Sequence, residues 1–130
     1  MLKVYFKPNC ATCITALQLI KQNSDDELET VEYLVETPSS KELKEIIKML
    51  GIKPEQLVRK KETLYKEKYE GKKITGAQWI KILSENPILI ERPIIVNGDK
   101  AIIGRPVESI ISFLKTPNKI QEIIIDLNHN

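Results

Sequence analysis

The chain contains few of the residues that indicate metal sites, disulfide scaffolds or membrane segments. Its 130 residues include two cysteines and one histidine, His129, which lies far along the chain from both cysteines. A zinc site needs about four ligands, so these residues do not make a convincing one and we expect no bound metal. No segment approaches the roughly 20 apolar residues of a membrane-spanning helix, so we expect no membrane partner.

The charge of the chain is also close to balanced. It carries 20 basic and 18 acidic residues, and the resulting net charge of +2 is too weak to favour nucleic acid as a partner. Lysines are concentrated only between Lys53 and Lys73. A solvated surface is the simpler interpretation of that segment, and a partner surface is the alternative.

The remaining composition is that of an ordinary globular domain. With 42% hydrophobic residues, the chain can form a single core of its own. A strand-like pattern begins at residue 2 and leaves no room for a signal peptide, so we expect a cytoplasmic monomer. In that compartment a close pair of cysteines is more often catalytic, redox-sensing or metal-binding than a structural disulfide.

Hydrophobic periodicity predicts alternating strands and helices in the first half of the chain. Apolar residues alternate over residues 2–6, and from Ala11 they recur at helical spacing. The segment TVEYLV, residues 30–35, is typical of a second strand. Ser39 and Glu42 form a capping-box pair, which predicts the start of a second helix.

The second half begins with an irregular, charged stretch at residues 52–73. Thr75 then opens another capping box and helix. Asn97 and Gly98 stand between the apolar runs PIIV and KAII, which is the strongest short-range signal of a hairpin. Pro106 suits the first turn of a last helix.

This order predicts an α/β fold of thioredoxin-like layout: a mixed four-stranded sheet flanked by helices, with Cys-X-X-Cys directly after the first strand. A β-α-β unit implies a parallel first pair of strands, and the hairpin adds antiparallel ones. We expect one domain over residues 1–115, with a helical insert at about 39–85, between the second helix and the final hairpin. Residues 116–130 form a tail or extra helix, which could mediate a dimer.

Cys10 and Cys13 are the strongest candidates for chemistry. Only the thiolate is nucleophilic, and the free N–H groups at a helix N-terminus favour it at Cys10, where Lys7 can add a cation. Cys13 falls one turn further into the helix, close enough to attack an adduct on Cys10, which suits a resolving thiol. The alternative is a pair of inert core residues, but Pro8 and Asn9 place Cys10 in a turn.

The segment NPILIERPIIVNGDKAIIGRP, residues 86–106, resembles the signature of the glutaredoxin-dependent arsenate reductase family. Pro8-Asn9-Cys10 and the segment QLVRKKETLYKE are similar to that family too, and the resemblance runs from residue 2 to about residue 115. It implies a thioredoxin-like fold with a helical insert. It also implies a cytoplasmic enzyme that reduces arsenate to arsenite with electrons from glutathione and glutaredoxin.

The resemblance implies roles for single residues. The nucleophile of the family falls on Cys10, and its cis proline falls on Pro93. Its three oxyanion-binding arginines fall on Arg59, Arg92 and Arg105. Guanidinium groups stay charged and pair with tetrahedral oxyanions through two donors, so they would bind arsenate and lower the pKa of the thiol together.

The chain differs from the well-studied arsenate reductases beside the nucleophile. Phe6 and Lys7 stand where those enzymes have His-Asn, and Ile14 replaces an arginine. Cys13 replaces a serine, which suggests an internal disulfide step before or instead of attack by glutathione.

Spx-type transcription regulators of the same superfamily carry a similar Cys-X-X-Cys, bind the RNA polymerase α subunit and use the pair as a redox switch. They usually lack the Gly-Arg-Pro element, so Arg105 favours the arsenate reductase branch. We therefore predict a thiol oxidoreductase with a small oxyanion substrate, no bound cofactor, and glutaredoxin or thioredoxin as redox partner. An Spx-type regulator and a general protein disulfide reductase are the alternatives.

Overall fold

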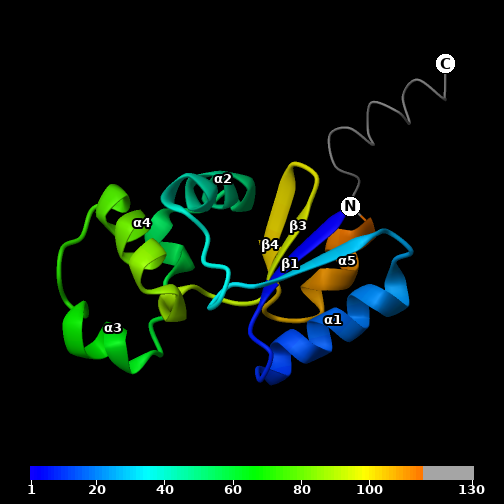
Figure 1. The fold of residues 1–130 in the computed structure, drawn as a ribbon, viewed down its shortest axis with the longest axis horizontal. Coiled ribbons are helices and arrows are strands. Elements are labelled where there is room, and N and C mark those ends of the chain that lie inside the picture. Colours follow the sequence, from blue (N-terminus) through cyan, green and yellow to red (C-terminus); the bar gives the residue numbers. More distant parts are fainter. Residues whose placement is uncertain (116–130) are drawn as a thin grey trace, which may run out of the picture. The chain divides into compact units, whose positions relative to one another are not determined.

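A computed structural model describes residues 1–115, and the predicted tail at residues 116–130 lies outside the described residues. The described chain divides into two compact units, one made of residues 1–31 and 92–115, the other of residues 32–91. The elements follow in this order (Figure 1): β1 (Leu2–Phe6), α1 (Ala11–Asn23), β2 (Leu28–Glu32), α2 (Ser40–Leu50), the 3-10 turn η1 (Pro54–Leu57), α3 (Thr63–Lys68), α4 (Gly76–Glu85), the 3-10 turn η2 (Pro87–Leu89), β3 (Ile94–Asn97), β4 (Lys100–Ile103) and α5 (Ser109–Lys115).

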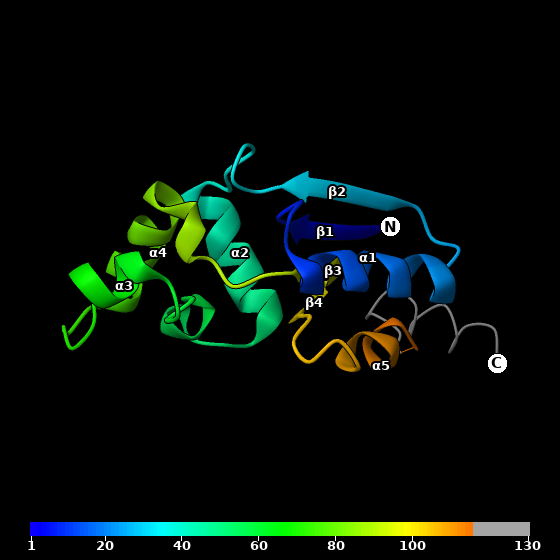
Figure 2. The ribbon, with the colours of Figure 1, turned by 90° about the horizontal axis from the view of Figure 1, so that it is seen from below.

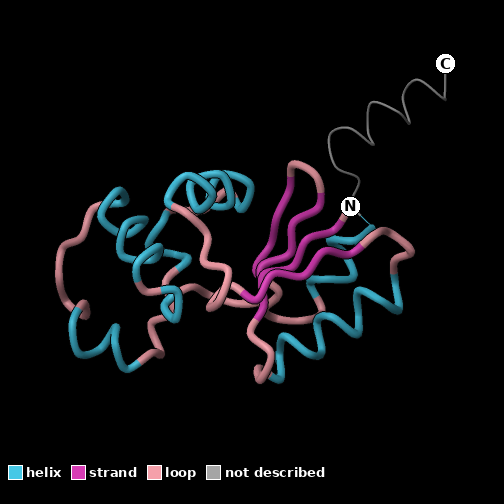
Figure 3. Tube along the Cα trace, in the orientation of Figure 1, coloured by secondary structure: helices cyan, strands magenta, loops and turns pink. Residues whose placement is uncertain are grey.

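The four strands form one sheet in the order β2-β1-β3-β4 (Figure 3). β1 pairs antiparallel with β3, with Tyr5 opposite Ile94, and β3 pairs antiparallel with β4, with Ile94 opposite Ile103. β1 and β2 run in the same direction (Figure 2), so the sheet is mixed, as predicted.

The core of the first unit lies between the sheet and two helices, α1 and α5, which pack against each other. The helical spacing predicted from Ala11 puts an apolar stripe of α1 against the inner side of β1 and β3. The buried members of this core are Leu2, Val4, Ala16, Ile20, Ile95, Ile110 and Phe113.

The second unit is helical, and the predicted N-cap residues Ser39 and Thr75 both cap their helices. Ser39 Oγ accepts the N–H of Glu42 at 3.1 Å at the start of α2. At α4, Thr75 Oγ1 accepts the N–H of Gln78 at 3.2 Å, and Gln78 Oε1 accepts the N–H of Thr75 at 2.8 Å. α2 and α4 pack on each other, and each buries aliphatic side chains. Trp79 of α4 is also buried and lies against the rings of Tyr65 and Tyr69.

The second strand and the last helix have boundaries that differ from the prediction, and the second strand begins at Leu28 rather than at residue 30. The second strand ends at Glu32 rather than continuing to residue 35, because the N–H groups of Val35 and Glu36 both bond to the Glu32 carbonyl and close a turn. The last helix begins at Ser109 rather than at Pro106, whose peptide bond with Arg105 is cis.

Candidate active site

The N-terminus of α1 presents the first thiol. Cys10 is the N-cap residue, with extended backbone angles, and its carbonyl accepts the N–H of Ile14 at 3.0 Å as the first bond of the helix. Its own N–H bonds to the Lys7 carbonyl at 3.3 Å, which closes the turn after β1. The Cys10 side chain is therefore half-buried at the positive end of a helix.

The second thiol has a different environment. Cys13 lies in the first turn of α1, on the same apolar stripe as Ala16 and Ile20, and is completely buried. Both cysteines are free thiols.

Two arginines from the far end of the sequence lie at the same place in the first unit. Arg105 Nη2 is 3.7 Å from Cys10 Sγ. The same guanidinium donates from Nε to the main-chain carbonyl of Arg92 at 2.6 Å. One planar group therefore contacts both the Cys10 thiol and the backbone just before β3. Arg92 is only 5% exposed and hydrogen-bonds to the Cys10 side chain.

These contacts decide the protonation of Cys10. Burial by itself would raise the pKa of this thiol. Hydrogen bonds from the Cys13 thiol, the Cys13 backbone and Arg92, together with the charge of Arg105, outweigh burial and lower the pKa to about 7. A large share of Cys10 is therefore thiolate near neutral pH.

Cys13 is shifted the other way. Burial raises its pKa to about 11, and the hydrogen bond and negative charge of Cys10 add to that rise, while the backbone of Lys7 and the charge of Arg92 oppose it. The two thiols thus form a pair in which one is a ready nucleophile and the other a protonated neighbour, the difference that we expected from their positions on the helix.

A glycine that the residue-by-residue prediction left without a role completes this arrangement. Gly104 donates its N–H to the Pro93 carbonyl at 2.8 Å, after a cis Arg92–Pro93 peptide bond. A Cβ at Gly104 would lie 2.9 Å from Pro93 Cγ and 3.2 Å from Ile110 Cδ1, closer than such atoms pack. The only sequence signal was its place in the Gly-Arg-Pro element.

Arg59 lies in the second unit. Its Nε donates to Glu62 Oε1 at 3.2 Å, and its N–H bonds to the Leu89 carbonyl at 2.6 Å. The structure therefore brings together Cys10, Cys13, Arg92 and Arg105, and the predicted role of Arg59 stays a prediction.

Within residues 1–115, no three His, Cys, Asp or Glu side chains gather as metal ligands would. No helix in this part of the chain has both the length and the apolar character needed to cross a membrane.

Comparison with known proteins points to one family. Residues 5–113 match the sequence model of the ArsC family. The chain is 37% identical over 113 residues to an arsenate reductase of Haemophilus influenzae, covering 85% of this chain and 97% of the relative. It is 36% identical over 114 residues to the uncharacterized protein YfgD of Escherichia coli, covering 86% and 95%.

A solved structure shows the same fold. The arsenate reductase from Vibrio cholerae superimposes with a TM-score of 0.80 at 32% identity, covering 85% of this chain and 95% of that one. The thioredoxin-like architecture predicted from the order of elements is thereby confirmed.

Proposed function

Because the chain belongs to the ArsC family, we propose that it is an arsenate reductase-like thiol oxidoreductase in which Cys10 is the nucleophile. One observation carries this proposal: Arg105 bridges Cys10 Sγ and the Arg92 carbonyl, so a cation-lined thiolate stands at a helix N-terminus. That arrangement suits attack on a tetrahedral oxyanion, whose negative charge the same donors attract.

The first step follows from the lowered pKa of Cys10. The thiolate attacks arsenic(V) and displaces one hydroxyl group of arsenate, which takes up one proton from solvent and leaves as water. The product is an arsenic–sulfur adduct on Cys10. Arg92 and Arg105 hold the remaining oxygens and balance the charge that gathers on them.

Cys13 then resolves the adduct. Its sulfur attacks Cys10 Sγ, a disulfide forms, and the electron pair of the S–As bond stays on arsenic, which departs as arsenite. The charge of Cys10 is one cause of the raised pKa of Cys13, so bonding Cys10 to arsenic removes that cause and eases loss of the Cys13 proton.

An external thiol system must reduce the Cys10–Cys13 disulfide after each turnover. Glutathione with glutaredoxin and thioredoxin are the candidate donors, and we place the reaction in the cytoplasm, where such donors keep thiols reduced. For Arg59, the oxyanion-binding role implied by the resemblance remains part of this proposal.

A general protein disulfide reductase is the second candidate. Ile14, one turn after Cys10, is 47% exposed, and an exposed apolar side chain beside a nucleophile suits a protein substrate.

The test is arsenite formation by the purified protein with glutathione plus glutaredoxin, run beside the thioredoxin system. We expect turnover in the wild type, none in Cys10→Ser, and a loss of at least about 100-fold with thioredoxin in Cys13→Ser. Reduction of a small disulfide without any arsenate turnover would favour the disulfide reductase. No turnover, together with redox-dependent binding of the RNA polymerase α subunit, would favour the regulator.

A further inference from the structure

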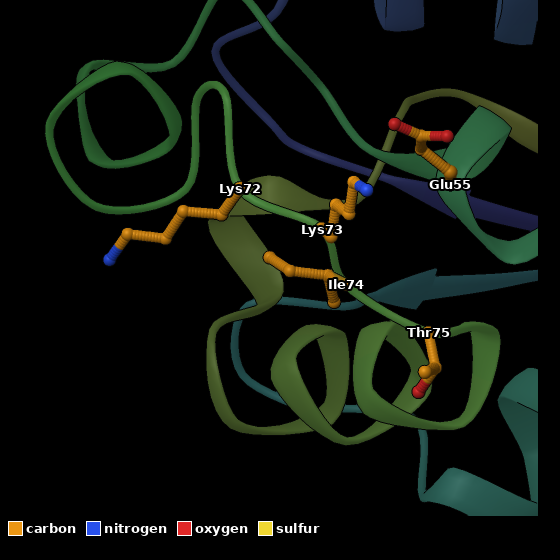
Figure 4. A pocket seen from close by; sticks show the side chains of 5 residues that line it. All are labelled: Glu55, Lys72, Lys73, Ile74 and Thr75. Carbon is orange, nitrogen blue, oxygen red and sulfur yellow. The ribbon is translucent and has the colours of Figure 1, made fainter.

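The second unit carries a groove that the proposed chemistry does not use. Two cavities of about 390 and 330 Å³ open on its surface, and both are lined by Lys72, Lys73 and Ile74. Figure 4 shows the first of them, which Glu55 and Thr75 also line. Because the two cavities share these lining residues, we call them together the lysine groove.

The groove has an apolar floor and a cationic rim. Half-buried Tyr69, Ile74 and Ile82 line the second cavity, and Lys72, Lys73 and Lys81 are exposed around it. In Figure 4 the side chains of Lys72 and Lys73 leave the backbone on opposite sides. Lysines at a rim like this can place ammonium groups over a bound segment while apolar atoms cover the floor.

The charge of the groove is not neutralised internally. Within residues 1–115, no ion pair joins Lys72, Lys73 or Lys81 to an acidic side chain. Glu55, the one acidic lining residue of these cavities, is 3.6 Å from Lys60 and so is already paired. Residues 53–81 hold nine basic and four acidic residues, a net charge of +5, whereas the whole chain carries +2.

From this charge and this floor we propose that the lysine groove binds an acidic segment of a partner protein that carries apolar side chains. Carboxylates would meet the lysines, and one or two apolar side chains would cover Tyr69, Ile74 and Ile82. A nucleic-acid strand is disfavoured, because the groove offers no arginine and only one aromatic ring, the half-buried Tyr69, on which successive bases could stack. None of the residues that line the groove takes part in the proposed thiol chemistry.

The chain contains its own reporter for this groove. Trp79 is its single tryptophan, and the Tyr69 ring that lines the groove lies 5.6 Å from it, centroid to centroid, at an angle of 58°. A side chain packed on Tyr69 should therefore change the fluorescence of Trp79.

The test titrates the full chain with a synthetic peptide, Glu-Asp-Glu-Leu-Asp-Glu-Phe-Asp, at about 20 mM salt, and follows Trp79 emission. We expect saturable binding that weakens about 5- to 50-fold in Lys72→Glu/Lys73→Glu and at about 300 mM salt. The matched control is Lys41→Glu/Lys44→Glu, an equal charge change on exposed positions of α2, which should bind as the wild type does. Circular dichroism checks that both variants are folded.

Three further results bear on the proposal. Replacing Leu and Phe of the peptide by Ser should weaken binding several-fold, because the floor is apolar. Absence of peptide binding, or an equal loss in both double variants, would overturn the proposal. So would tighter binding of a 12-nucleotide single strand that Lys72→Glu/Lys73→Glu abolishes, since that result assigns the groove to nucleic acid. Arsenate turnover is measured in parallel and should not change in either double variant.

Discussion

At the scale of single residues, the two thiols of one helical turn differ because their neighbours differ. Cys10 meets Arg92 and Arg105, while Cys13 meets the core and the negative charge of Cys10. Position on the helix alone would separate them less, since the effect of a helix N-terminus is limited to its first turn.

This difference should be visible in alkylation. Iodoacetamide modification, followed for each cysteine by peptide mass spectrometry, should show a midpoint near pH 7 for Cys10 and near pH 11 for Cys13. Arg105→Gln removes a cation 3.7 Å from the sulfur and should raise the Cys10 midpoint by up to about one unit. Equal reactivity of both thiols at every pH would contradict the assigned roles.

The guanidinium of Arg105 acts through two donors at once. A lysine keeps the charge but cannot span Cys10 Sγ and the Arg92 carbonyl together. We expect Arg105→Lys to lower kcat/KM for arsenate by roughly 5- to 150-fold, or about 1–3 kcal/mol of transition-state binding. Oxidation of the thiol pair by a small disulfide needs no anion site and should stay nearly unchanged, so an equal loss in both reactions would oppose an anion-binding role.

At the scale of elements, Gly104 lets the loop between β4 and α5 pack closely against the start of β3. A Cβ there would meet Pro93, Ile110 and Ile95 at 2.9–3.3 Å. We expect Gly104→Ala to cost about 1–3 kcal/mol in the free energy of unfolding and to raise the alkylation midpoint of Cys10, because displaced Pro93 carries Arg92 with it. Gly76→Ala, where the nearest contact is 3.3 Å from Pro54, is the control and should leave the Cys10 midpoint unchanged.

The helix α4 depends on its capping box. Thr75→Ala removes the acceptor for the Gln78 N–H, and we expect a loss of about 1 kcal/mol in the free energy of unfolding, measured by urea titration. Thr63→Ala, at the exposed first residue of α3, removes no cap and should change stability by less than about 0.5 kcal/mol. Equal losses would show that the cap does not stabilise α4.

At the scale of the whole molecule, the thiol pair makes stability depend on pH. The folded-state pKa of Cys10 lies below its unfolded value of about 8.5, so its contribution is present above that value and is lost as the pH falls through 7. The folded-state pKa of Cys13 is raised, so its contribution is present below about 8.5 and is lost as the pH rises toward 11.

Under reducing conditions, the contribution of these two thiols to the free energy of unfolding should therefore rise from pH 7 to about 8.5 and fall at higher pH. Urea titrations at several pH values test this for the wild type, Cys10→Ser and Cys13→Ser. Cys10→Ser should lose the rise in stability between pH 7 and about 8.5, and Cys13→Ser should lose the fall above about pH 8.5. Identical profiles in all three proteins would mean that neither shifted pKa is linked to folding.

Local signals in the sequence determined the start of α1 at Ala11, the N-caps at Ser39 and Thr75, and the hairpin at Gly98, whose φ is 65°. Each of these features depends on atoms within a few residues of one another, so composition and spacing suffice. The mixed sheet followed from the order of these elements and the handedness of the β-α-β crossover. The family signature named Cys10, Arg92 and Arg105, but it did not show how they are arranged.

Only the tertiary structure decided that arrangement. Two N–H groups of Arg105 contact Cys10 Sγ and the Arg92 carbonyl, residues that are far apart along the chain. Gly104 packs closely on Pro93, although the whole hairpin separates them in the sequence. The end of β2 at Glu32 and the start of α5 at Ser109 also departed from the local pattern. The two element ends are set by turn hydrogen bonds within four residues, a detail finer than hydrophobic periodicity resolves. The contacts of Arg105 and Gly104 have a different physical reason: they depend on distances between remote residues, which periodicity along the chain does not contain.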